Sequence, residues 1–102
     1  MNLAIDKYIS QLNLLCEKYR VTELYLFGSA VGGDFIEESD VDLLVSFSSD
    51  LPLLDYADNY LDLIDELKQL FGRDIDLLTS SSLKNPYLTS SINAGKKLLY
   101  AA

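Results

Sequence analysis

The residues best placed to do chemistry are Gly28-Ser29 and, after ten intervening residues, Asp40-Val41-Asp42. A glycine permits a tight turn and a close approach of phosphate to the backbone, and a serine at a helix start offers an anion its hydroxyl and N–H. Because side chains alternate along a strand, Asp40 and Asp42 would share one face, roughly 6.6 Å apart. We therefore expect Gly28 and Ser29 to bind phosphate groups, and Asp40 and Asp42 to bind a metal ion.

The metal expected at this pair is Mg²⁺. Mg²⁺ prefers oxygen ligands, commonly one or two carboxylates with phosphate oxygens and waters, and paired ions can clamp an in-line phosphoryl displacement. The segment from Val21 to Asp42 holds six acidic residues and no Lys or Arg. Such a field repels a bare triphosphate, so we expect the metal to be required.

A third carboxylate is needed to complete the metal site and to take the proton from an attacking hydroxyl. Asp74-Ile75-Asp76 supplies two candidates at the start of a later strand. We favour Asp76, and Asp74 remains the alternative.

Composition narrows the classes of function. The 102 residues suit a single domain, and their formal net charge of -8 disfavours a long nucleic acid as partner. The absence of histidine and the lone Cys16 exclude a Ser-His-Asp triad and most zinc sites. The chain shows no secretory signal and no apolar stretch of the roughly 20 residues that cross a bilayer, so we expect a soluble protein in the reducing cytoplasm.

The patterning predicts an α+β (mixed α/β) fold in which a small mixed sheet packs on helices. Apolar residues at three- and four-residue steps predict a helix over 3–19 and a longer one from about 52 to about 72. The apolar side of the longer helix is expected to comprise Leu53, Leu54, Ala57, Leu61, Ile64, Leu67, Leu70 and Phe71. Strands are expected at 22–27, 41–47, 74–79 and 97–100, with short helical segments after Ser29 and after Pro86.

The segment FGSAVGGDFIEESDVDLLV resembles the signature of the DNA polymerase beta superfamily, and specifically of its minimal nucleotidyltransferases. The resemblance covers nearly the whole chain, with Asp76 at the position of the family's third aspartate and Leu99-Tyr100 at its terminal strand. It implies a polymerase beta palm-like fold and Mg²⁺-dependent transfer of a nucleoside monophosphate, AMP from ATP in the expected case, to a hydroxyl. It also implies a partner, since such proteins often act as antitoxins of HEPN-domain toxins and some adenylylate a toxin tyrosine.

The chain departs from that signature in one respect. Many relatives carry arginines after the glycine-serine, whereas this chain has Ala30 and Gly32. The alternative function is therefore a catalytically weak or inactive binding module that neutralises its partner by occlusion. A domain this small encloses little substrate, so a partner or a second copy of the chain is expected to help bind the acceptor.

Overall fold

A computed structural model describes residues 5–28, 40–80, 90 and 95–102 of the chain. In these ranges a 3₁₀ turn, Ile5–Tyr8, leads into helix α1, Ile9–Lys18, and the long helix α3 spans Leu53–Phe71. The strands are β1, Val21–Phe27, β2, Val41–Phe47, β3, Ile75–Thr79, and β4, Lys97–Ala101. They form one mixed sheet in the order β3-β2-β1-β4, in which only the β2–β3 pair is parallel. The α+β prediction is confirmed.

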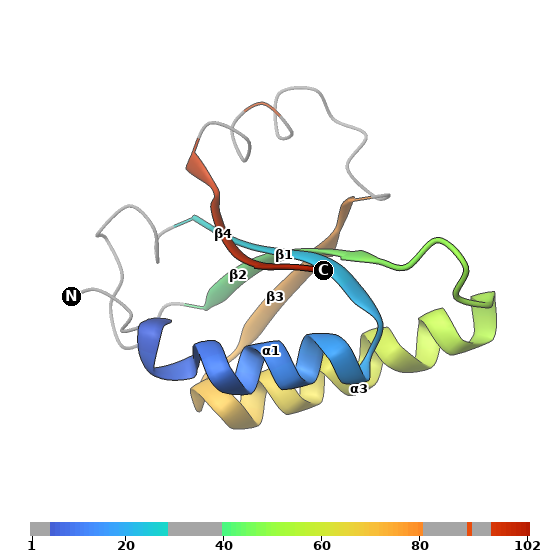
Figure 1. The fold of residues 1–102 in the computed structure, drawn as a ribbon. Coiled ribbons are helices and arrows are strands. Elements are labelled where there is room, and N and C mark those ends of the chain that lie inside the picture. The colour runs from blue at the N-terminus through green and yellow to red at the C-terminus, as the bar shows by residue number, and fades with distance from the viewer. Residues whose placement is uncertain (1–4, 29–39, 81–89, 91–94) are drawn as a thin grey trace.

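Both helices pack on the same face of the sheet, as Figure 1 shows. Along α1 the predicted apolar residues turn inward, and Leu12 and Cys16 are fully buried. From the sheet, Val41, Leu43 and Val45 project toward the helices and are likewise fully buried. Since side chains alternate along a strand, the residues between these on β2 project to the opposite face, which neither helix covers.

The prediction of which side of α3 is buried is wrong for the first half of the helix. Leu53, Leu54 and Leu61 are 81%, 80% and 60% exposed, whereas the residues buried on this helix are Leu63, Leu67 and Phe71. The reason is that the beginning of α3 extends beyond the end of α1 (Figure 1), where no second helix lies beside it. The predicted end is confirmed, because Gly72 follows the helix in a left-handed conformation with its N–H bonded to the carbonyl of Lys68.

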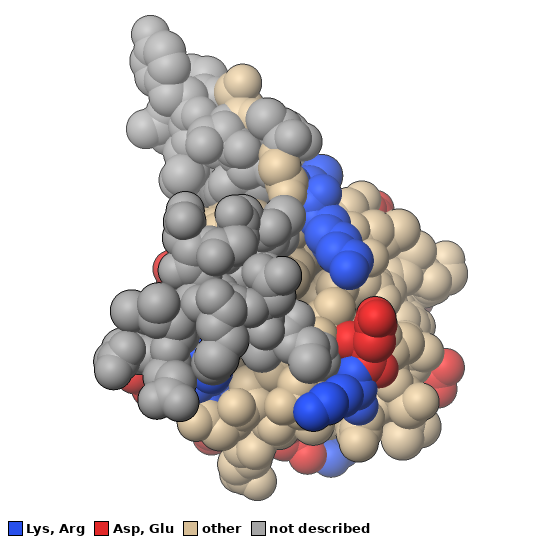
Figure 2. Space-filling model, turned by 90° about the vertical axis from the view of Figure 1, so that its left-hand side faces the viewer, with Lys and Arg blue, Asp and Glu red and all other residues tan. Residues whose placement is uncertain are grey.

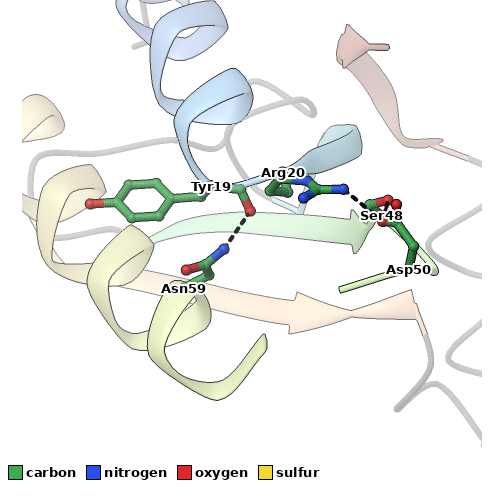
Figure 3. A network of polar contacts seen from close by, with 5 residues as sticks. All are labelled: Tyr19, Arg20, Ser48, Asp50 and Asn59. Atoms are coloured by element: carbon green, nitrogen blue, oxygen red, sulfur yellow. Dashed lines mark hydrogen bonds and ion pairs between the residues drawn. The ribbon is translucent and has the colours of Figure 1, made fainter. Parts of the chain in front are cut away.

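A set of polar contacts fixes where β1 begins (Figure 3). Arg20 adopts a φ of 64° between α1 and β1, and its guanidinium donates to Asp50 Oδ1 at 2.7 Å. Ser48 also donates to that carboxylate, and these contacts hold the pKa of Asp50 below its usual value. Asn59 on α3 donates to the carbonyl oxygen of Tyr19 at 3.0 Å. The α1–β1 connection is thereby joined both to the end of β2 and to α3.

Several predictions concern residues outside the described ranges. They are the helical segments after Ser29 and Pro86, Ser29 itself, and the positions of Ala30 and Gly32. Within the described residues, no helix is both long and apolar enough to span a membrane.

Candidate active site

Asp42 lies on the face of the sheet opposite the helices, at the centre of the candidate site. It pairs with Phe27 of β1 on one side and with Asp76 of β3 on the other. Residues directly opposite on neighbouring strands project to the same face, so the carboxylates of Asp42 and Asp76 lie next to each other. The sequence alone predicts that both acids lie on strands, but it is the parallel pairing of β2 with β3 that puts Asp42 directly opposite Asp76.

Gly28 ends β1 directly beside Asp42. Its φ is +76°, a conformation that favours glycine. A Cβ built on this residue would stand 3.2 Å from Cγ and 3.4 Å from Cβ of Asp42, and closer still to Oδ2. The absence of a side chain at Gly28 is thus what lets the Asp42 carboxylate occupy its position. Ser29, the other residue expected to bind phosphate, lies outside the described residues.

Burial raises the pKa of Asp42 above its ordinary value, and the neighbouring charges of Asp76 and Asp40 raise it further. All three influences disfavour the ionised carboxylate. Asp42 therefore lies in a negative field that a cation would relieve.

Asp74, the alternative third carboxylate, precedes β3 instead of lying on it. Its backbone carbonyl accepts a hydrogen bond of 3.0 Å from the N–H of Val41, which helps to align β2 and β3. Its charge is not among the causes that shift the pKa of Asp42, whereas that of Asp76 is. The geometry thus brings Asp76, and not Asp74, beside the central carboxylate.

The acids do not form a completed metal cage. Among the described residues, no group of three or more His, Cys, Asp or Glu side chains has an arrangement that could hold a metal ion. Carboxylate oxygens are still the ligands that Mg²⁺ takes, and Mg²⁺ commonly uses only one or two of them. The residues present therefore fit a magnesium site that substrate phosphates complete.

Tyr25, Glu23 and Lys96 form a second polar group on the same face. Tyr25 pairs with Leu44 of β2, which shares a face with Asp42. Its hydroxyl donates to Glu23 Oε2 at 2.5 Å, and Lys96 Nζ lies 4.1 Å from the centre of its ring. Sequence reasoning missed this group, because the register that brings β4 beside β1 is not evident from either segment alone.

On the side of the molecule that Figure 2 shows, basic and acidic side chains lie among uncharged ones and form no basic patch among the described residues.

A cavity of about 460 Å³ lies between α3 and β3. Its lining is mainly aliphatic and aromatic, including Tyr56, Tyr60, Leu61 and Leu77, and it contains no carboxylate. Tyr60 closes one side by donating to the carbonyl of Leu77 at 2.6 Å. The chemistry-bearing residues lie on the sheet face and not in this cavity.

Comparison with known sequences agrees with this geometry. The family model of the nucleotidyltransferase domain matches residues 9–99. A Methanocaldococcus jannaschii protein, provisionally named a protein adenylyltransferase, is 40% identical over 80 residues, which are 78% of this chain and 77% of that protein. The protein adenylyltransferase MntA of Thermococcus cleftensis is 41% identical over 71 residues, 70% of this chain and 68% of that one.

Solved structures share the fold. A toxin–antitoxin structure with AMP-PNP has a TM-score of 0.71 at 24% identity and is matched over 98% of this chain and 75% of the other. A protein provisionally described as a minimal nucleotidyltransferase has a TM-score of 0.70 at 28% identity, with 95% of both chains covered.

The family model extends over most of the chain, and the relatives exceed the identity at which a common family is secure. The fold is also that of the minimal nucleotidyltransferases. The chain therefore belongs to the nucleotidyltransferase family, as one of its minimal, polymerase beta-like members, and is an enzyme of the nucleotidyl-transferring class.

Proposed function

We propose that the chain uses Mg²⁺ to transfer AMP from ATP to a hydroxyl of a partner protein. The observation that carries the proposal is the pairing of Asp42 with Asp76, with the bare backbone of Gly28 against the Asp42 carboxylate. Two adjacent carboxylates on the sheet face that neither α1 nor α3 covers offer oxygen ligands and a proton acceptor in one place.

Each site residue has a role in this reaction. Asp40, Asp42 and Asp76 would hold Mg²⁺, which supplies charge neutralisation at the phosphates when bound. Gly28 and Ser29 would bind the triphosphate through backbone N–H groups and the serine hydroxyl. The acceptor hydroxyl oxygen forms a bond to the α-phosphorus as the bond to the bridging oxygen breaks and pyrophosphate leaves. Asp76 accepts the hydroxyl proton.

The names of the relatives support a protein acceptor. Several are named protein adenylyltransferases, and structures of similar fold are described as toxin–antitoxin complexes, one of them a tri-AMPylated HEPN toxin with its MNT antitoxin. We propose by analogy that the partner of this chain is a HEPN-type toxin, that ATP is the donor, and that the two proteins meet in the cytoplasm.

A second candidate function is neutralisation of the partner by occlusion without transfer. Two observations favour it. The described carboxylates do not converge as a preformed metal site, and the chain has Ala30 and Gly32 where arginines are frequent in relatives. An occluding module would bind its partner equally well without nucleotide.

The decisive experiment combines nucleotide binding with transfer. Thermal unfolding is measured with ATP and Mg²⁺ for the unsubstituted protein, for Asp42→Asn, and for Asp65→Asn as control. Asp65 is an exposed acid of α3, so the control makes the same chemical change away from the site. We expect ATP with Mg²⁺ to raise the melting temperature of the unsubstituted and control proteins and not that of Asp42→Asn, because a ligand selective for the native state stabilises it.

Transfer is then tested by coexpressing each protein with the product of its neighbouring gene and measuring the mass of that partner. AMP addition by the unsubstituted and Asp65→Asn proteins, and none by Asp42→Asn, is the expected result. A partner that is bound and neutralised but never modified, by a chain that ATP does not stabilise, would establish the occluding module instead.

A further inference from the structure

Among the described residues, Lys96 places its ammonium beside Tyr25, on the face that carries Asp42 and Asp76. Its ammonium lies 4.1 Å from the centre of the Tyr25 ring, and Tyr25 is itself held by its hydrogen bond to Glu23. An ammonium over an aromatic ring is attracted by the negative π face, which restricts where the lysine head can lie. Lys96 is therefore positioned, although it is near the surface.

Lys96 takes no part in an ion pair within the described residues. Lys18 pairs with Glu66 and Arg20 pairs with Asp50, and neither ion pair involves Lys96. Lys96 is also half-buried, whereas the next residue, Lys97, is exposed. A positioned cation that has no acidic partner among the described residues is available to an anionic ligand.

The register sets the separation between this cation and the carboxylates. Tyr25 precedes Phe27 by two residues, and Phe27 pairs with Asp42, so the ring lies roughly 7 Å along β1 from the level of Asp42. The site thus has an acidic part and a cationic part, with a gap between them.

We propose that Lys96, held over the ring of Tyr25, binds a phosphate of the nucleotide whose Mg²⁺ is held by the carboxylates. This inference rests on the proposed function, since it requires that a nucleotide bind to this face. A triphosphate is anionic along its length, so it can meet a metal at one phosphate and an ammonium at another. Lys96, which directly precedes β4, would supply the positive charge that Ala30 and Gly32 do not.

Lys97 provides a matched control. It is adjacent in the chain and exposed, but it pairs with Leu26, whose side chain is buried on the helix side of the sheet. The substitutions Lys96→Met and Lys97→Met therefore remove the same charge from opposite faces of the sheet, directly before β4 and at its first residue.

The test measures the Kd of ATP at saturating Mg²⁺ by calorimetry, together with the Kd of Mg²⁺ alone. We expect Lys96→Met to weaken ATP binding about tenfold, as befits the loss of one charge-assisted phosphate contact, and to leave the Kd of Mg²⁺ unchanged. Lys97→Met should bind ATP as the unsubstituted protein does, and Lys96→Arg should restore most of the loss. Tyr25→Leu, which keeps the charge and removes the ring, should weaken ATP binding by a smaller factor.

Two results would overturn the inference in different ways. Equal ATP affinity in Lys96→Met and Lys97→Met, with binding lost in Asp42→Asn, would remove Lys96 from the site and leave the proposed function intact. No ATP binding by the unsubstituted protein would contradict the proposed function and the inference together.

Discussion

Two properties of Gly28 explain why a glycine lies beside Asp42, and replacing Gly28 by alanine perturbs both. One reason is conformational, since the residue has a φ of +76°. The other is spatial, since an added Cβ would meet the Oδ2, Cγ and Cβ atoms of Asp42. The Cβ of Asp42, at 3.4 Å, would be in ordinary van der Waals contact, but Oδ2 and Cγ would be too close, so the Asp42 carboxylate must leave its position.

Gly72 provides a control that has only the first reason. Its φ is +66°, and a Cβ built on it would meet no atom within 4 Å. A left-handed conformation costs a non-glycine residue roughly 1–2 kcal/mol, and this is the whole expected cost of Gly72→Ala. Overpacking adds about 1–3 kcal/mol, so Gly28→Ala should lose about 2–5 kcal/mol.

Urea denaturation in EDTA measures these two losses, and thermal unfolding with ATP and Mg²⁺ measures the site. Gly72→Ala should lower the melting temperature by about 4–16 °C and keep its full shift with ligand. Gly28→Ala should be less stable and should also lose most of the ligand-induced shift, because Asp42 is displaced. Equal destabilisation of the two variants, with the ligand shift intact in Gly28→Ala, would refute the reasoning that Gly28 makes room for Asp42.

Three further predictions concern the carboxylates, the α1–α3 contact and the core. In EDTA at neutral pH, Asp42→Asn should be more stable than the unsubstituted protein by up to about 1 kcal/mol, because two charges about 5 Å apart repel by that amount in water. Because the pKa of Asp42 is raised in the native state, the native state binds this proton more tightly than the unfolded state does. The contribution of Asp42 to the free energy of unfolding should therefore fall as pH rises from 3.8 through the raised pKa. Urea midpoints measured across that range should show this fall for the unsubstituted protein and not for Asp42→Asn. Asn59→Ala should cost about 1 kcal/mol of unfolding free energy by removing the bond to the Tyr19 carbonyl, as equilibrium urea denaturation would show. Cys16 is fully buried, and burial raises the pKa of its thiol to about 12. A thiol reagent should therefore label Cys16 only after the protein unfolds. Rapid labelling of the native protein would contradict this burial.

The sequence predicts most of the secondary structure because local patterns specify it. The strand over 41–47 and the glycine that ends α3 follow from apolar runs and turn residues, and the structure has both. The inward side of α3 could not be predicted in the same way. Several leucines of α3 are equally compatible with a helical apolar side, and which ones are buried depends on where α1 and the sheet end.

The candidate site is predictable to the same limited extent. Asp40, Asp42 and Asp76 can be identified from spacing and resemblance, but their contacts depend on pairing between strands. The choice between Asp74 and Asp76 illustrates this, because both lie near the start of one strand and only the β2–β3 register puts one of them opposite Asp42. Lys96 is a stronger case, since its relation to Tyr25 passes through the pairing of β4 with β1.

The charges of this face argue that metal and nucleotide bind together. Without a cation, ionisation of Asp42 is opposed by its own burial and by two neighbouring carboxylates, and the described acids include no group of three that could hold a metal ion. Mg²⁺ alone would relieve that repulsion but would lack the phosphate oxygens that usually complete its ligands. ATP alone would meet Lys96 and then the same acids that oppose it. Each ligand therefore removes the main cost of binding the other, and the site is completed only by both.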